Sequence, residues 1–431
     1  MNNNITILKR FGISIGTLSL LFLACNSTNQ LKKNSEKTKI TEVIGIKPDL
    51  IREPYLQKVR KDSTFITWKT NGVVKNCYVS ITERATKSNS IIKGYLTPHE
   101  GFMFNEVAIS GLKPNTIYNY SIYSNGHLLA GGTDYYFKTA PKDKNSPFSF
   151  YALGDIGAKE QGSFAMEPAN RITELAIKPD FGLGLGDIVY PKGESKNYDN
   201  HLFKPFKDVF KNIPFYPVAG NHDWLSVNHD ENFKKEWNLP NKEYYYTFSY
   251  ANTLFIGLDS RDGNFYDYEH QTVWLKNTLS ENKGKFDWIV VYLHHNGKSC
   301  TYKQDYEHVI SLYDIFASYN VDLVLNGHAH TYERLKPYDG NGNIDSSQNN
   351  QSLYENLENQ FISITIGAGG KINKKWEPNP NNNKNCDDGT IVAHSEHVAS
   401  FGLISIDKKT LSFKGINSFT GDAFDEFIIK K

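Results

Sequence analysis

Five short apolar segments beyond residue 147 each end in a side chain that can bind a metal ion. The segments are FSFYALGD, FGLGLGD, FYPVAGN, DWIVVYLH and VDLVLNGH, and they end in Asp155, Asp187, Asn221, His294 and His328. Apolar runs of this length, bounded by turn residues, are typical of buried strands. Segments with a mixed helical pattern, such as NRITELAIK and EHVISLYDIFASY, lie between them. The pattern therefore predicts an α/β fold.

The position of these donors at strand ends explains how residues far apart in the chain can share a site. Ligands of open α/β sheets bind in the crevice beyond the carboxyl ends of the strands. After the last of the five segments, Gly327 allows a sharp turn, and His328 and His330 then point the same way from an extended loop. We therefore expect the five strand-end residues and His330 to converge.

The types of donor indicate a pair of metal ions. Two ions held roughly 3.5–4 Å apart need a bridging group, and a carboxylate can give oxygen atoms to both. Imidazole suits zinc and iron, whereas carboxylate and amide oxygens suit harder ions, so this set favours iron, zinc or manganese over copper. Taken singly, a Gly-Asp pair is commonly a turn and GNHD can cap a helix. Five such motifs, each at a strand end, favour a binuclear site.

These motifs resemble, in order, the five motifs of the calcineurin-like metallophosphoesterases. They are GDIG (154–157), GDIVY (186–190), GNHD (220–223), VYLH (291–294) and GHAH (327–330). Tyr190, three places after Asp187, makes the chain more narrowly similar to the purple acid phosphatases, in which a tyrosine at this place binds ferric iron. The resemblance implies an α/β (α+β) metallophosphoesterase sandwich of mixed sheets flanked by helices, over residues 146–431.

The resemblance also implies a role for each residue. His294 rather than His295 is the expected ligand, because the family's ligand directly ends the apolar run. His222, which follows Asn221, corresponds to the family's catalytic histidine near the phosphate and the leaving group. Matched motif by motif, the resemblance implies that the first metal, Fe³⁺, is bound by Asp155, Tyr190 and His330. The second metal, which is Zn, Mn or Fe, is held by Asn221, His294 and His328. Asp187 bridges the two.

We expect such a site to hydrolyse small phosphomonoesters with a metal-activated hydroxide, His222 giving the leaving alkoxide its proton. Plant members of the family place substrate-binding histidines shortly after the VYLH motif, whereas NGKSCTYKQDY here contains none, so the substrate contacts stay open. One alternative is a phosphodiesterase that acts on nucleotides through the same dimetal core. Another is a non-catalytic surface-binding lipoprotein, and the intact ligand set argues against it.

The preceding segment, residues 48–142, has a different pattern. Short β-type runs split by turn residues, among them DSTFITWKT, NCYVSITER and TIYNYSIYSNG, predict a small antiparallel sandwich. The stretches GLKPNTIYNYSI and YYFKTAP, with Trp68 as a candidate core residue, also resemble a fibronectin type III domain. This resemblance implies a fold and no activity. PKDKNSPF, residues 141–148, is the expected linker to the second domain.

The first 25 residues carry Lys9 and Arg10, then an apolar run, then Cys25, which predicts a secretory signal, with an uncleaved short anchor helix as the alternative. LFLAC followed by a polar, Lys-rich stretch is similar to a bacterial lipoprotein signal. Residues 26–47 are polar and aperiodic, as expected of a tether. We therefore expect an exported protein, periplasmic or at the cell surface, with its only membrane contact through a lipid on Cys25.

Charge and cysteine usage agree with export of a small-molecule enzyme. The formal net charge of +1 gives no bulk electrostatic reason to bind nucleic acid. In an oxidising compartment Cys300 and Cys386 could pair, which would leave Cys77 free as a small core residue.

Overall fold

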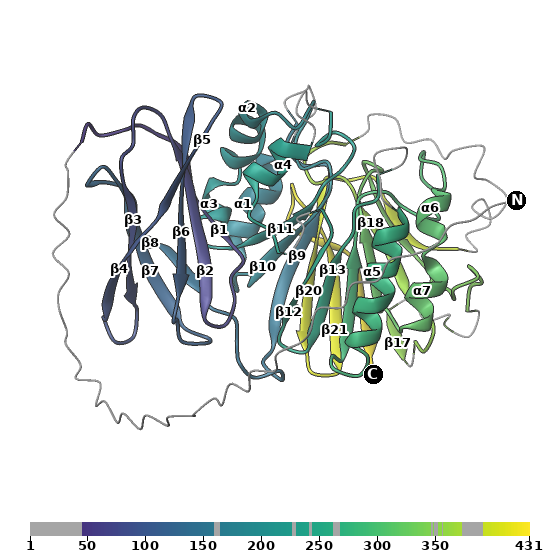
Figure 1. Cartoon of the computed structure of the whole chain (residues 1–431). Coiled ribbons are helices and arrows are strands. Elements are labelled where there is room, and N and C mark those ends of the chain that lie inside the picture. The colour runs from purple at the N-terminus through teal and green to yellow at the C-terminus, as the bar shows by residue number, and fades with distance from the viewer. Residues whose placement is uncertain are drawn as a thin grey trace, which may run out of the picture. The chain divides into compact units, whose positions relative to one another are not determined.

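The computed structural model of the chain (Figure 1) describes residues 45–158, 164–225, 230–240, 244–261, 268–345, 348, 352–355, 357–372 and 391–431. All of these residues belong to one compact unit, Glu42–Lys431. The expected signal peptide, Cys25 and the tether up to residue 44 lie outside the described residues. Within the described part of the chain, no helix is both long and apolar enough to span a membrane.

The first part of this unit is all-β. It contains eight strands: β1 (Leu50–Gln57), β2 (Ser63–Thr70), β3 (Cys77–Glu83), β4 (Asn89–Lys93), β5 (Tyr95–His99), β6 (Phe102–Ser110), β7 (Ile117–Ser124) and β8 (His127–Lys138). They form two antiparallel sheets, in the orders β1-β2-β6-β5 and β4-β3-β7-β8. Every second side chain of β7 is buried, as a strand with one covered face requires. Trp68 is fully buried, and its indole donates a hydrogen bond to Ser124 Oγ (3.0 Å).

Over its described residues, the second part contains two seven-stranded sheets. Their strands are β9 (Phe148–Leu153), β10 (Phe181–Leu185), β11 (Phe215–Val218), β12 (Tyr246–Tyr250), β13 (Thr253–Gly257), β14 (Trp288–Tyr292), β15 (Leu323–Asn326), β16 (Tyr332–Leu335), β17 (Leu353–Glu355), β18 (Ile362–Ile366), β19 (Val392–Glu396), β20 (Ser400–Asp407), β21 (Thr410–Asn417) and β22 (Ala423–Lys430). The orders are β11-β10-β9-β20-β21-β22-β17 and β12-β13-β14-β15-β18-β16-β19, with parallel and antiparallel pairs in each. Mixed sheets of this kind confirm the predicted fold class.

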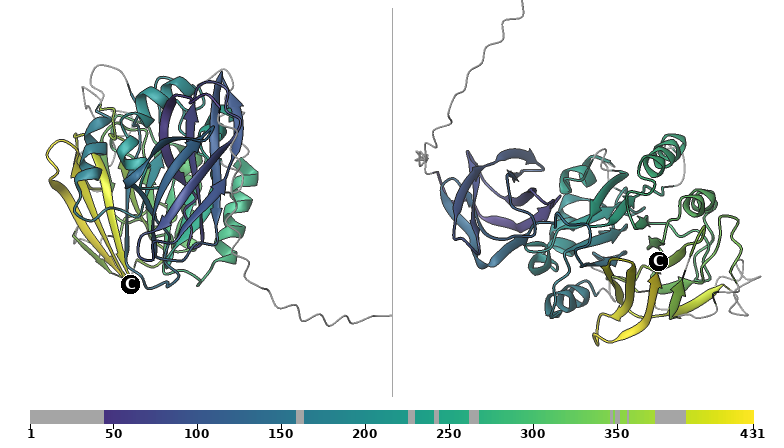
Figure 2. Two further views of the ribbon diagram at one scale, coloured as in Figure 1. Left: turned by 90° about the vertical axis from the view of Figure 1, so that its left-hand side faces the viewer. Right: turned by 90° about the horizontal axis from the view of Figure 1, so that it is seen from below.

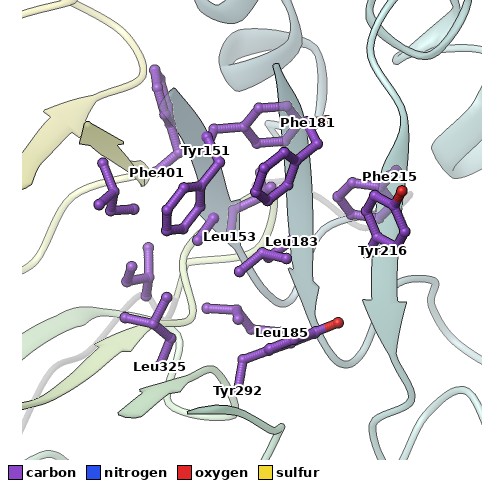
Figure 3. Packing of buried hydrophobic residues seen from close by; sticks show 14 of the residues in the cluster. Tyr151, Leu153, Phe181, Leu183, Leu185, Phe215, Tyr216, Tyr292, Leu325 and Phe401 are labelled. Carbon is purple, nitrogen blue, oxygen red and sulfur yellow. The ribbon is translucent and has the colours of Figure 1, made fainter. Parts of the chain in front are cut away.

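The five apolar segments form the strands β9, β10, β11, β14 and β15, but these strands belong to two sheets rather than to one open sheet. The sheets pack face to face around a common core (Figure 3), in which Leu153 and Leu185 of the first sheet lie with Tyr292 and Leu325 of the second. All four side chains are buried, because strands covered on both faces need apolar side chains on both. The donors therefore approach the site from two layers.

The helices are mostly short and lie outside the sheets, as the green helices in Figure 2 show. They are α1 (Met166–Glu174), α2 (Ser195–Asn197), the π-helix η1 (Tyr198–Phe203), α3 (Lys207–Phe210), α4 (Asp230–Glu236), α5 (Tyr268–Glu281), α6 (Glu307–Ile310) and α7 (Tyr313–Ser318). Leu275 and Leu279 of α5 and Phe316 of α7 pack with Val291 and Val324 in a second core. This core covers the outer face of the sheet that contains β14 and β15.

Two ion pairs of one arginine join the all-β part to the rest of the unit. Arg52 of β1 contacts Asp199 of η1 (Nη2–Oδ1 2.5 Å) and Glu236 of α4 (Nη1–Oε2 2.5 Å). Lys69 of β2 also contacts Asp199 (Nζ–Oδ2 2.6 Å). Arg52, Lys69 and Glu236 are buried. We call Arg52, Lys69, Asp199 and Glu236 the Arg52 cluster.

Among the described residues, Cys77 is a free and buried thiol, and Cys300 is in a disulfide. Cys386, its expected partner, lies outside the described residues.

Candidate metal centre

The seven side chains predicted as ligands meet beyond the carboxyl ends of the five strands. Each of the five strands is followed, two or three residues after its end, by one donor. In the order β9, β10, β11, β14 and β15, the donors are Asp155, Asp187, Asn221, His294 and His328. Tyr190 and His330 lie a few residues further along the second and fifth of these loops. The structure arranges them in two groups on either side of Asp187.

The first group consists of Asp155, Tyr190 and His330. The Tyr190 phenol donates to Asp155 Oδ1 (2.7 Å), and His330 Nε2 lies 3.2 Å from both the phenol oxygen and Asp155 Oδ1. Asp155 and Tyr190 are buried. Burial and the neighbouring carboxylates raise the pKa of the Tyr190 phenol well above its ordinary value. Ionisation of this phenol would therefore need a cation beside it, which a metal ion would supply.

The second group consists of Asn221, His294 and His328. His294 Nε2 lies 3.1 Å from Asn221 Oδ1 and 3.1 Å from His328 Nδ1. His294 Nδ1 donates to the Leu185 carbonyl (3.0 Å), which leaves Nε2 as the nitrogen that faces the other two donors. Three electron-pair donors turned toward one point suit a cation, and a neutral imidazole there is an ordinary zinc or iron ligand.

Asp187 lies between the two groups. Its Oδ2 accepts a hydrogen bond from the Tyr190 phenol (2.8 Å), and its Oδ1 lies 3.4 Å from His294 Nε2. Burial opposes ionisation of Asp187, but the His294 imidazole outweighs it and holds the pKa of this carboxyl below its usual range. Burial lowers the pKa of His294, whereas Asp187 raises it, to about 9 on balance. The Asp187 carboxylate thus favours a positive charge at the point where the second group converges, and a metal ion would fit that place.

Comparison with known proteins agrees with this geometry. Residues 148–332 match the calcineurin-like phosphoesterase family. Purple acid phosphatase 18 of Arabidopsis thaliana is 25% identical over 345 residues, which are 73% of this chain and 71% of that protein. Acid phosphatase type 7 of Danio rerio is 25% identical over 334 residues, 68% of this chain and 72% of that protein. The chain is a purple acid phosphatase homologue with a calcineurin-like phosphoesterase domain.

The fold of a plant purple acid phosphatase supports the same conclusion. The structure of purple acid phosphatase PPD1 from yellow lupin seeds superimposes with a TM-score of 0.73 at 18% identity, over 88% of this chain and 74% of that one. The family is one of metal-dependent phosphatases with a binuclear centre, and the Asp/His groups found here are consistent with such a centre. The phosphatase homologue therefore has both the fold and a suitable donor set.

His222 lies at the border of the phosphatase centre. Its backbone N–H donates to Asp187 Oδ1 (2.7 Å), and its ring lies against that of Tyr190, with 4.4 Å between the ring centroids. The ring Nδ1 donates to the Pro191 carbonyl (2.9 Å), which fixes the tautomer and leaves Nε2 for proton transfer. The side chain is partly exposed.

The backbone of three candidate ligands is unusual. Asp155, Asp187 and His328 have positive φ angles of 56°, 45° and 69°, a region that non-glycine residues rarely adopt. The loops also approach one another closely: a Cβ on Gly220 would lie 2.3 Å from Asp187 Oδ1. Strained conformations of this kind cluster at functional sites, where the surrounding structure holds them in place.

Three residues near the centre have functions that sequence reasoning did not assign. Asp223 accepts hydrogen bonds from the backbone N–H groups of Gly220 (2.8 Å) and Ile188 (3.0 Å), and so ties the Asn221 loop to the Asp187 loop. Tyr306 Oη lies 2.7 Å from His328 Nε2, and the Tyr302 phenol accepts from the His330 N–H (3.0 Å). The motif GNHD contains Asp223 and could have indicated it. No sequence motif indicated Tyr302 or Tyr306.

His295, expected as a residue behind the ligands or on the substrate side, packs against the second group. Its Nδ1 lies 3.0 Å from Ser260 Oγ, and its ring centroid lies 4.5 Å from that of His328. Burial, with His294 beside it, lowers the pKa of His295 well below the ordinary value. One of its ring nitrogens also lies within 4.8 Å of a ligand atom of His294 and of His328. The direct contact of Asn221 and Asp187, however, is with His294.

Proposed function

We propose that this chain is an exported dimetal phosphohydrolase that hydrolyses phosphomonoesters. The observation that supports it most is the position of Asp187, whose two carboxylate oxygens face two separate groups of donors. A single bridging carboxylate between two donor sets is what a pair of metal ions requires.

Fe³⁺ would be held by Asp155, Tyr190 and His330. The divalent ion (Zn, Mn or Fe) would be held by Asn221, His294 and His328. Asp187 would bind both ions. When bound, the two ions activate a water molecule and offset the negative charge of the phosphate. The Leu185 carbonyl at His294 Nδ1 and Tyr306 at His328 Nε2 orient the two imidazoles, and such partners commonly change metal affinity by about 10–100-fold.

His222 would protonate the leaving alkoxide. Its Nδ1 is engaged by the Pro191 carbonyl, so the imidazolium can release the proton from Nε2 without turning. The contact of its ring with Tyr190 and the hydrogen bond of its N–H to Asp187 fix its place beside the two donor groups. A positioned acid of this kind contributes roughly 10²–10⁴-fold to the rate.

Metal analysis of the purified protein, with its visible spectrum, tests the centre. We expect two metal ions per chain, one of them iron, and a broad absorption band from the Tyr190 phenolate. Asn221→Ala should lower metal content and turnover of p-nitrophenyl phosphate, whereas Asn341→Ala, on an exposed loop, should change neither. Unchanged metal content and turnover in Asn221→Ala would contradict the ligand assignment.

The same assay separates the proposed activity from its alternatives. A phosphomonoesterase hydrolyses p-nitrophenyl phosphate faster than bis(p-nitrophenyl) phosphate, and a nucleotide phosphodiesterase shows the reverse order. Metal content near zero with no hydrolysis of either compound would favour a surface-binding lipoprotein.

We also propose that residues 1–25 direct export and that Cys25 carries a lipid. The charged start, the apolar run and the small residues before Cys25 support this proposal. In a bacterial host, the full chain should sediment with membranes, and Cys25→Ser should move the phosphatase to the soluble fraction. Mass spectrometry of the wild-type protein should show a lipid on Cys25, and an unmodified Cys25 would exclude the lipid anchor.

A further inference from the structure

Apolar side chains are exposed at one end of the all-β sandwich. Ile46, Val73 and Leu128 are 90%, 78% and 52% exposed, and they belong to three segments: the start of the described chain, the loop between β2 and β3, and the start of β8. Apolar patches that a protein keeps on its surface commonly mark a contact with another surface. We call these three residues, with the neighbouring Lys47 and Lys75, the tip.

The side chain of Asn125, in the turn between β7 and β8, holds these segments together. Its amide nitrogen donates to the carbonyls of Ile46 (3.0 Å) and Val73 (2.9 Å), and its Oδ1 accepts the Lys75 N–H (2.8 Å). Asn125 is buried, and Leu128 follows shortly after it as the second residue of β8. The tip is therefore one connected surface rather than three independent loops.

The tip combines its apolar side chains with positive charge. Lys47 and Lys75 are exposed. The neighbouring Asp49 carboxylate accepts a hydrogen bond from the Asn71 side chain (2.7 Å). At the surface of an anionic bilayer, apolar side chains enter the boundary between headgroups and acyl chains, and lysines are attracted by the lipid phosphates. The chemistry of the tip suits such a surface.

The chain also leads from the tip toward the proposed lipid anchor. Gly45 is the first described residue, and its carbonyl oxygen lies 2.9 Å from Nε2 of His127, next to Leu128 in β8. Residues 26–47 are the expected tether, and a flexible tether of about 20 residues has a root-mean-square reach of only about 25 Å. A lipid on Cys25 would therefore hold the tip near the bilayer at a high effective concentration, so that a weak affinity is sufficient.

We propose that the tip docks on an anionic lipid bilayer, with Ile46, Val73 and Leu128 in the acyl boundary and Lys47 and Lys75 at the headgroups. The inference rests on the proposed export and on the proposed lipid at Cys25. The protein would then be held at two points, the lipid and the tip, which fixes its orientation on the membrane.

A dye whose emission rises in apolar surroundings tests the contact. The dye NBD is attached to the new thiol of full-length, lipidated Val73→Cys protein in vesicles of phosphatidylcholine and phosphatidylglycerol. We expect the emission to rise and nitroxide-labelled lipids to quench it. Lys61→Cys, at an exposed site in the turn at the other end of β1 and β2, is the matched control and should stay unquenched. Wild-type protein treated with NBD corrects for any reaction at Cys77, the buried free thiol.

Further substitutions in the Val73→Cys protein separate the apolar from the charged contribution. Leu128→Asp should remove most of the quenching, because a carboxylate would have to enter the boundary. Lys47→Gln and Lys75→Gln should each lower the ratio of docked to undocked protein about fivefold, and together about thirtyfold. Lys430→Gln, at an exposed site at the end of β22, should change nothing. Hydrolysis of p-nitrophenyl phosphate should be the same in every variant, which shows that the fold is intact.

Equal quenching at positions 73 and 61, or quenching at neither, would overturn the proposal. Emission that rises with the density of protein on the vesicles, but that labelled lipids do not quench, would mean that the tip contacts a second copy of the chain, and this also overturns it.

Failure of the proposed anchor is recognised separately, because mass spectrometry would then find Cys25 unmodified. In that case the labelled protein is added to the same vesicles from solution. Quenching at position 73 alone would still support docking of the tip, and its absence would overturn the proposal independently of the anchor.

Discussion

The candidate metal centre and the Arg52 cluster both bury carboxylates, but they balance the charge in different ways. In the Arg52 cluster, Asp199 and Glu236 face an arginine and a lysine at 2.5–2.6 Å. At the centre, Asp155 and Asp187 face a phenol, imidazoles and backbone N–H groups, and among the described residues their ion partners within 4.0 Å are histidines. A buried carboxylate needs a countercharge. The protein supplies it with an arginine and a lysine in one region and with histidines in the other, where the proposed metal ions would add to it.

Loss of the bridging carboxylate should have the largest effect. Asp187→Asn keeps the shape of the side chain but removes the charge that both donor groups share, so we expect kcat for p-nitrophenyl phosphate to fall about 10³–10⁴-fold, or about 4–5.5 kcal/mol at the barrier. Metal content should fall below two ions per chain. Circular dichroism should stay like that of the wild type, and a normal turnover rate would show that Asp187 does not bridge.

Loss of Arg52, which balances the carboxylates of the Arg52 cluster, should lower stability rather than activity. Arg52→Met keeps much of the packing against Phe203 but leaves Glu236 and Asp199 with less compensation, so the free energy of unfolding should fall by about 3–5 kcal/mol. Denaturant melts of metal-free protein measure it. Arg84→Met, at an exposed site, should cost about 0.5 kcal/mol or less. Metal content and kcat of the folded Arg52→Met protein should be unchanged, and a loss of either would tie the two regions together.

Glu333 is a third kind of buried carboxylate, one whose burial favours the protonated form. It accepts from the Cys300 N–H (2.8 Å) and the Ser299 hydroxyl (3.0 Å), and burial raises its pKa from about 4.5 to about 7. A raised acid pKa gives stability that is fully present below about pH 4.5 and is lost as the pH rises through about 7. Relative to Glu333→Gln, the wild-type protein should lose up to about 3 kcal/mol of unfolding free energy over that window. Parallel pH dependences of the two proteins would mean that Glu333 stays ionised.

The smallest effect is expected for Tyr190→Phe, which removes one of the proposed ligand oxygens but neither carboxylate. The visible band should disappear, and kcat should fall less than about tenfold, or about 1.4 kcal/mol. Absorption spectra and turnover of the same sample measure both. Tyr292→Phe, a fully buried tyrosine of the core, is the matched control and should keep the band. A band that persists in Tyr190→Phe would require another phenolate on iron.

The strands that position the site could be predicted because each combines a buried apolar run with a polar end. The pairing of β9 with β20, which is 250 residues later in sequence, could not, because periodicity says nothing about which strands are neighbours. The edge strands β4 and β5 were not predicted, because most of their side chains are exposed and their sequences show no alternation of apolar and polar residues. Helix α5 buries Gln271 with Leu275 and Leu279, and a stripe with a polar member is a weak helical signal.

The site itself was predictable where a motif sits at a strand end and was not where a loop reaches across the fold. Asp223 is inside GNHD, yet its contact with the Ile188 N–H joins two loops 35 residues apart. Tyr302, Lys303 and Tyr306 come from NGKSCTYKQDY, which has no pattern that fixes where its side chains point. Only the folded chain shows that this loop brings the phenols of Tyr302 and Tyr306 to His330 and His328.

The donors come from two packed sheets, and this determines when the site can form as the chain folds. Asp155, Asp187 and Asn221 come from one sheet, and His294 and His328 come from the other. A nascent chain can therefore assemble the proposed coordination sphere only after both layers have docked. Metal uptake then becomes a late event in maturation, and release of the ions should be an early sign that the layers are separating.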